Sequence, residues 1–132
     1  MRTPKKLIVV ENTPYMQVIL EAALGDGAEV QQVGGTMECI AALDSAACIF
    51  VDLMLEEIDG LSLIEKIRLR NRTIPVAAFV SSSELASLDI NASATRSMAH
   101  QSGADAVFIT PFNLGEIILT VSQFLEPVAA TA

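Results

Sequence analysis

The sequence contains no tryptophan, one tyrosine and only two cysteines among its 132 residues. Cys39 and Cys48 lack the spacing of a CxxC or zinc motif, so we expect two reduced thiols that pack in the interior of a cytoplasmic protein. No apolar run approaches the roughly 20 residues that a membrane-spanning helix requires. The apolar stretch 7–10, which follows a basic N-terminus, is too short for a signal peptide. The sequence therefore predicts a cytoplasmic protein without a membrane anchor.

Positive charge is also scarce. Eight lysines and arginines face 16 aspartates and glutamates, for a formal net charge of -8. Such a surface repels a polyanion, so direct binding to nucleic acid is not expected. Hydrophobic residues make up 52% of the chain, which is enough to build one core and argues against disorder. We expect a single domain over 1–132, with its core at about 5–125 and a frayed tail or the start of a linker at 127–132.

Short apolar runs alternate with amphipathic stretches, a pattern typical of βα repeats around a parallel sheet. The strands are expected at 7–10, 29–33, 48–51, 74–80 and 106–109, with the more polar second one at the sheet edge. Helices are expected after Thr13, after Thr36, at 61–70, at 92–101 and after Asn113, with Thr13, Thr36 and Asn113 as N-terminal caps and Gly25 ending the first helix. The stretch before 92 is weakly periodic and predicts a loose segment. The fold class is therefore α/β, a doubly wound parallel sheet of five strands.

Polar side chains follow the predicted strands at the points where these strands end: Glu11 and Asn12, Asp52, Ser81, and Thr110. The carboxyl ends of parallel strands share one edge of the sheet, so these groups are expected to converge there. Carboxylate and amide oxygens suit Mg²⁺, and an aspartate beside that ion can attack a phosphoryl group. The alternative stays open that polar residues stand there only because the chain emerges into water.

Five segments in order resemble the receiver domains of bacterial response regulators, over about residues 5–125. They are VVENTP at 9–14, FVDLML at 50–55 followed by DGL at 59–61, IPV at 74–76, GAD at 103–105 and PF at 111–112. The resemblance implies a flavodoxin-like fold with strand order 2-1-3-4-5. It also implies a signalling function, in which a histidine kinase or a phosphotransfer protein donates a phosphoryl group.

The resemblance makes Asp52 the phosphoacceptor and assigns Mg²⁺ to Glu11, Asn12, Asp52 and the backbone carbonyl of Met54. The family's first-strand pair is normally two aspartates. Glu11 is longer by a methylene and Asn12 carries no charge, so we expect a weakened magnesium site.

Two further positions depart from the family's pattern or leave its register open. The switch hydroxyl falls on Ser81, or by counting from Pro75 on Val80. The family's lysine is replaced by Thr110, which offers a hydrogen bond but no charge. Arg96 is a candidate to supply the missing charge. The segment 81–103 is longer than is usual in the family and lies where many receivers bind partners.

Two functions follow from these departures. The leading hypothesis is a receiver that is phosphorylated on Asp52 and then acts on an output domain or a protein partner, or forms a homodimer. The second is a pseudo-receiver, a protein-interaction module that needs no phosphorylation. An enzyme acting on a small substrate is disfavoured, because the chain contains no GxGxxG or P-loop motif and Met54 stands where a dehalogenase-like phosphatase needs a second aspartate.

Overall fold

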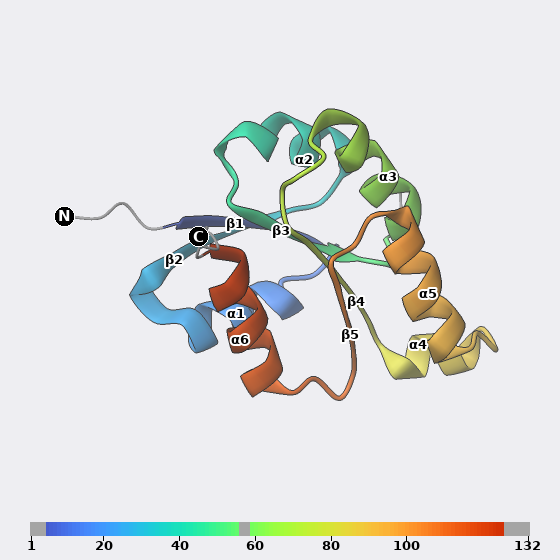
Figure 1. The fold of residues 1–132 in the computed structure, drawn as a ribbon. Helices are drawn as coiled ribbons and strands as arrows, with labels where there is room; N and C mark the ends of the chain where they lie inside the picture. The colour runs from blue at the N-terminus through green and yellow to red at the C-terminus, as the bar shows by residue number, and fades with distance from the viewer. Residues whose placement is uncertain (1–4, 56–58, 126–132) are drawn as a thin grey trace, which may run out of the picture.

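A computed structural model describes residues 5–55 and 59–125 of the chain. Its centre is a sheet of five parallel strands in the order β2-β1-β3-β4-β5, which confirms the predicted fold (Figure 1). The strands are β1 (Lys5–Val10), β2 (Ala28–Val33), β3 (Cys48–Asp52), β4 (Val76–Val80) and β5 (Ala106–Ile109). Strand β4 is wholly apolar, and β3 is apolar until its last residue, Asp52, because helices cover both faces of the sheet at its centre.

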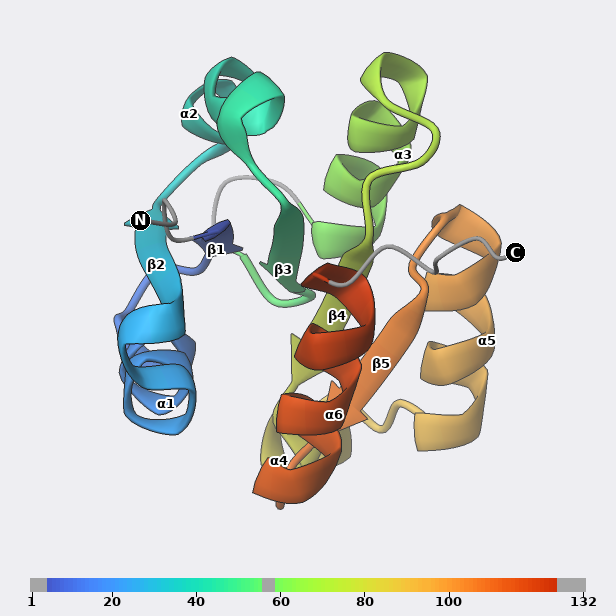
Figure 2. The ribbon, with the colours of Figure 1, turned by 60° about the vertical axis from the view of Figure 1, so that its left-hand side comes forward.

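The helices lie in two layers (Figure 2). One face carries α1 (Tyr15–Leu24) and α6 (Leu114–Leu125), which pack on the side chains of Val9, Phe50 and Phe79. The other face carries α2 (Thr36–Ala42), α3 (Gly60–Arg70) and α5 (Ala92–Ser102), which pack on Val10 and Val51. A short helix, α4 (Ser82–Ser87), follows β4, and two 3-10 turns, η1 (Gly25–Gly27) and η2 (Leu43–Ser45), follow α1 and α2. Among the described residues, no helix is long and apolar enough to cross a membrane.

The register of the sheet places the expected polar groups at one edge. Val10 pairs with Val51, so Glu11 and Asp52 stand at adjacent strand ends. Val80 pairs with Ile109, so Ser81 and Thr110 follow at the same level on the next two strands.

Some expected helix boundaries were wrong. Thr13 does not cap α1, which begins at Tyr15 after Pro14, and Thr36 is the first residue of α2 rather than its cap. Gly25 ends α1 with a φ of 59°, and the side chain of Asn113 accepts a hydrogen bond from the Glu116 amide of α6, as predicted.

Strand β4 and the segment after it also differ from expectation. Strand β4 begins two residues later than predicted, because the Asn71 side chain accepts hydrogen bonds from the amides of Thr73 and Ile74 and holds them in a turn. The segment expected to be loose contains α4. The predicted tail at 127–132 lies outside the described residues.

Candidate functional site

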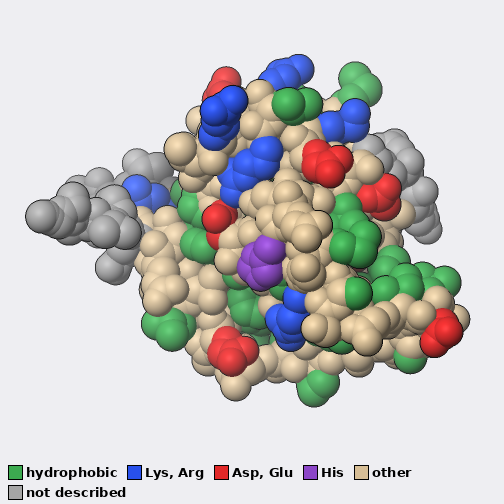
Figure 3. All heavy atoms as spheres, turned by 45° about the vertical axis from the view of Figure 1, so that its right-hand side comes forward, with side chains coloured by type: hydrophobic (Ala, Val, Ile, Leu, Met, Phe, Trp, Pro, Cys, Tyr) green, Lys and Arg blue, Asp and Glu red, His purple; other side chains and the backbone are tan. Residues whose placement is uncertain are grey.

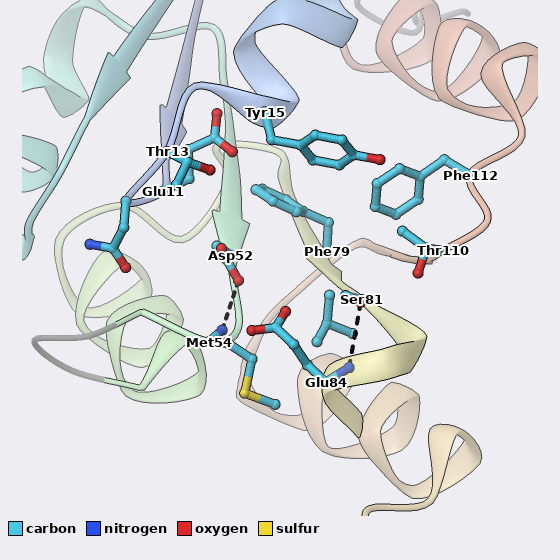
Figure 4. Close-up of a pocket in the computed structure, with 12 residues that line it drawn as sticks. Glu11, Thr13, Tyr15, Asp52, Met54, Phe79, Ser81, Glu84, Thr110 and Phe112 are labelled. Atoms are coloured by element: carbon cyan, nitrogen blue, oxygen red, sulfur yellow. Dashed lines mark hydrogen bonds between the residues drawn. The ribbon is translucent and has the colours of Figure 1, made fainter. Parts of the chain in front are cut away.

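A pocket of about 380 Å³ opens at the carboxyl edge of the sheet (Figure 4). All of the residues predicted to form a site line it: Glu11, Asn12, Asp52, Met54, Ser81 and Thr110. They come from the ends of β1, β3, β4 and β5, which the parallel topology gathers at one edge. Tyr15 and Phe112 close one side with their rings, whose centroids lie 6.2 Å apart.

Asp52 ends β3 and is partly buried. Its Oδ1 accepts a hydrogen bond from the Met54 amide at 2.8 Å, which fixes the orientation of the carboxylate. Burial raises the pKa of Asp52, and the nearby Glu84 carboxylate raises it further, against the opposing effect of the Met54 hydrogen bond. The structure thus holds a carboxylate in a restrained orientation at the pocket, in surroundings that disfavour its negative charge.

The backbone behind Asp52 needs a glycine. A Cβ at Gly60 would lie 2.5 Å from the carbonyl oxygen of Asp52 and 2.5 Å from Cα of Leu53. Asp59 is the N-cap of α3, and its carboxylate accepts a hydrogen bond from the Ser62 amide at 2.8 Å. The Asp-Gly pair is therefore the point at which α3 begins against the end of β3.

Glu11 is oriented differently from the expected metal ligand. The residue is only 1% exposed, and its two carboxylate oxygens accept hydrogen bonds from the amides of Met16 and Gln17, each at 2.9 Å. Burial raises the pKa of Glu11, although these two hydrogen bonds work in the opposite direction. Glu11 thus caps the first turn of α1, the position for which the sequence had suggested Thr13.

The two hydroxyl groups at the pocket are also engaged in the local structure. Ser81 Oγ accepts hydrogen bonds from the amides of Ser83 and Glu84, so Ser81 is the N-cap of α4. Thr110 Oγ1 accepts from the Ser82 amide at 2.8 Å, across 28 residues of sequence. Val80 also lines the pocket but belongs to β4, so Ser81 is the first hydroxyl at this strand end.

Glu84 is the acidic residue of this pocket that the sequence did not indicate. Its carboxylate points from α4 toward Asp52 (Figure 4). No motif marks it, because it lies in the weakly periodic segment whose helix was not predicted. With Glu11 and Asp52, it gives the pocket three carboxylates.

Within 5–55 and 59–125, no lysine or arginine lines this pocket. Arg96 does not replace the missing lysine there, because it is not among the lining residues and its guanidinium donates to the Val107 carbonyl at 2.9 Å. Four of the chain's eight basic residues instead lie at 66–72, in α3 and just after it. Figure 3 shows lysine and arginine side chains gathered on the upper part of the face that carries α3 and α5. The described lining of the pocket is therefore acidic, with no basic side chain among its residues.

The donor chemistry of the pocket fits a hard divalent cation. The lining supplies the Asp52 and Glu84 carboxylates and the Asn12 side-chain amide, whose oxygen atoms are the type of ligand that Mg²⁺ prefers. In the described part of the chain, no group of three or more histidine, cysteine, aspartate or glutamate side chains is arranged to hold a metal. A cation here would therefore rely on few acidic ligands and on water, which is usual for Mg²⁺.

A family model matches most of the chain. The model of the response regulator receiver domain matches residues 7–122. The transcriptional regulatory protein SrrA of Staphylococcus aureus is 26% identical over 129 residues, covering 96% of this chain and 50% of SrrA. The chain thus spans about half the length of the curated relatives that it matches.

Solved structures share the fold. A putative response regulator from Chloroflexus aurantiacus superposes with a TM-score of 0.77 at 23% identity, over 93% of this chain and 98% of that one. A two-component response regulator from Clostridium difficile gives a TM-score of 0.77 at 23% identity, over 96% and 99% of the two chains.

Proposed function

This chain belongs to the response regulator receiver domain family of two-component systems, and we propose that it accepts a phosphoryl group on Asp52. The donor is a histidine kinase or a histidine phosphotransfer protein, and the chain works in the cytoplasm as a signalling module rather than as an enzyme on a small substrate. The observation that carries this proposal is the Asp52 carboxylate, which is held by the Met54 amide at an oxygen-lined pocket.

The proposed reaction is a single phosphoryl transfer to Asp52. A carboxylate oxygen of Asp52 attacks the phosphorus atom, the bond from phosphorus to the donor nitrogen breaks, and an acyl phosphate remains on Asp52. The Met54 amide holds Oδ1, so the carboxylate does not have to be oriented during the reaction. Mg²⁺, when held by Asp52, Asn12 and the Met54 carbonyl, would supply positive charge that is absent from the described lining of the pocket.

The added charge provides the signal. The phosphoryl group brings roughly two negative charges into the pocket, close to the first turn of α4. Ser81 and Thr110 hold the first turn of α4 and also line the pocket, so either hydroxyl can turn from α4 toward phosphoryl oxygens. Phosphorylation would in this way loosen α4 and change the surface formed by α4 and α5.

The signal passes to a protein partner, to an output domain of a longer protein or to a second copy of the chain. SrrA is named a transcriptional regulatory protein, and this chain covers only 50% of it. An acidic receiver of this charge would influence such an output through protein contacts rather than by touching DNA itself.

A second function, that of a phosphorylation-independent pseudo-receiver, is favoured by one observation. The groups that assist phosphorylation in the family are replaced or engaged: Thr110 stands for the lysine and accepts a hydrogen bond from the Ser82 amide of α4, and Glu11 caps α1. In this alternative the same fold presents a constant binding surface.

Phosphorylation in vitro separates the two functions. The protein is incubated with Mg²⁺ and acetyl phosphate, and intact mass is compared for the wild type, Asp52→Asn and the control Asp44→Asn, an exposed residue of η2. We expect a phosphoryl adduct on the wild type and the control but not on Asp52→Asn. If the folded wild type gains no adduct and also fails to bind beryllofluoride, the pseudo-receiver function holds instead.

A further inference from the structure

We propose that Glu84 is the second acidic ligand of the divalent cation at Asp52, in the role that a first-strand acidic residue has in related receivers. The inference rests on the proposed function and adds a residue to its site. It follows from where the acidic side chains of the pocket are placed, and it assigns a cation-binding role to a segment that the sequence presents as an irregular insertion.

Glu11 is badly placed for this role. Both of its carboxylate oxygens accept hydrogen bonds from amides of α1, and the residue is 1% exposed. To bind a cation directly, the carboxylate would have to leave the buried Met16 amide without its partner, at a cost of about 1–3 kcal/mol. The first-strand residue that keeps a carboxylate is therefore committed to stabilising a helix.

Glu84 has the opposite properties. It is exposed to solvent and lines the same pocket as Asp52. Its backbone is fixed in the first turn of α4, where Ser81 Oγ accepts a hydrogen bond from its amide. The side chain reaches from there toward Asp52 (Figure 4).

Charge balance favours a cation between the two carboxylates. Asp52 and Glu84 repel each other, and no lysine or arginine among the described residues lines the pocket to offset them. A divalent cation that contacts both would turn this repulsion into attraction, with Asn12 and the Met54 carbonyl as neutral oxygen ligands.

A purely local role for Glu84 makes a different prediction. An acidic residue in the first turn of a helix is stabilised by the amides of that turn, whether or not a cation is near. In that case, removing the carboxylate would leave cation binding unchanged, whereas ligation requires a loss of affinity.

Cation binding can be measured without phosphorylation. Free Mn²⁺ is counted by electron paramagnetic resonance during titration of the full chain, as a stand-in for Mg²⁺. Tb³⁺, a second oxygen-seeking cation, is followed by luminescence sensitised by Tyr15, which lines the pocket and is the only tyrosine in a chain without tryptophan. The variants are Glu84→Gln, Glu84→Asp and the control Glu65→Gln, an exposed residue of α3, and circular dichroism establishes that each is folded.

We expect Glu84→Gln to weaken Mn²⁺ binding by about tenfold or more and to reduce Tb³⁺ luminescence, while Glu65→Gln leaves both unchanged. Glu84→Asp keeps the negative charge but shortens the side chain. If Glu84 is a ligand, this variant also loses affinity for Mn²⁺, whereas if the charge acts only at a distance, the affinity is unchanged. Wild-type affinity in Glu84→Gln, or in Glu84→Asp, overturns the inference. If the Glu84→Gln variant binds the cation normally and still gains a phosphoryl adduct on Asp52, the proposed function holds and only the inference on Glu84 is wrong.

Discussion

Replacing Gly60 by alanine tests how tightly α3 is fitted against the end of β3. The new Cβ would lie 2.5 Å from two backbone atoms of the strand end, the Asp52 carbonyl oxygen and the Leu53 Cα. An ordinary contact of this kind is 3.4 Å or longer, so α3 and the strand must separate by roughly 0.9 Å. Neither atom belongs to a flexible side chain. The hydrogen bond from the Gly60 amide to the Leu53 carbonyl, 3.1 Å long, lies at the same contact and would be stretched.

We expect this change to destabilise the fold by about 3 kcal/mol, at the upper end of the usual cost of overpacking. The assay is urea unfolding followed by circular dichroism, with the midpoint and the slope fitted separately. The matched control is Gly27→Ala, where no atom lies within 4 Å of the added Cβ and φ is not positive. That control should be neutral or more stable by up to about 1 kcal/mol. If Gly60→Ala unfolds at the wild-type midpoint, the close approach of α3 to Asp52 is not as described.

Three other changes test the residues around the pocket and the last helix. Glu11→Ala removes the acceptor for two helix amides, and we expect urea unfolding to show a loss of about 3 kcal/mol; a wild-type midpoint would show that Glu11 does not cap α1. Asp52→Asn should be more stable than the wild type at neutral pH. The folded-state pKa of Asp52 is raised above its ordinary value of 3.8, so the wild type loses stability as pH rises from that value through the folded-state pKa. The difference in unfolding free energy between the variant and the wild type should therefore shrink on acidification. A difference that stays constant across pH would contradict burial as the cause of the raised pKa. Asn113→Ala removes the cap of α6 and should cost about 1 kcal/mol in the same assay, with an unchanged midpoint counting against that cap.

The sheet and its order could be predicted because the strands carry a strong local signal. Apolar runs such as 48–51 are buried on both faces, and the polar residue that follows each run marks the carboxyl edge. Parallel topology then brings Asp52, Ser81 and Thr110 to one pocket without any knowledge of their contacts.

The details that could not be predicted depend on contacts between distant residues. Helix α4 has only six residues and weak periodicity, and its first turn is held by Thr110, 28 residues away. Thr13 has the residue type of a helix cap, yet the buried Glu11 carboxylate satisfies those amides instead. Glu84 lines the pocket because it lies in the first turn of α4, so its position could not be predicted without that helix.

These unpredicted contacts affect the mechanism more than they affect the fold. A receiver with a lysine at position 110 would carry its own cation at the phosphoryl group, whereas here Thr110 and Ser81 tie the site to α4. The described lining of the pocket is consequently acidic, and phosphoryl transfer there depends on a bound cation to offset the negative charge.

Locating the phosphoryl group is the most direct test of the central claim that Asp52 is the acceptor. After incubation with Mg²⁺ and acetyl phosphate, borohydride reduces an aspartyl phosphate to homoserine, and peptide mass spectrometry finds the position of that residue. We predict homoserine at position 52 and unmodified aspartate at 59, the next aspartate along the chain. Reduction at another carboxylate, or none at position 52 in a folded protein, would contradict the account.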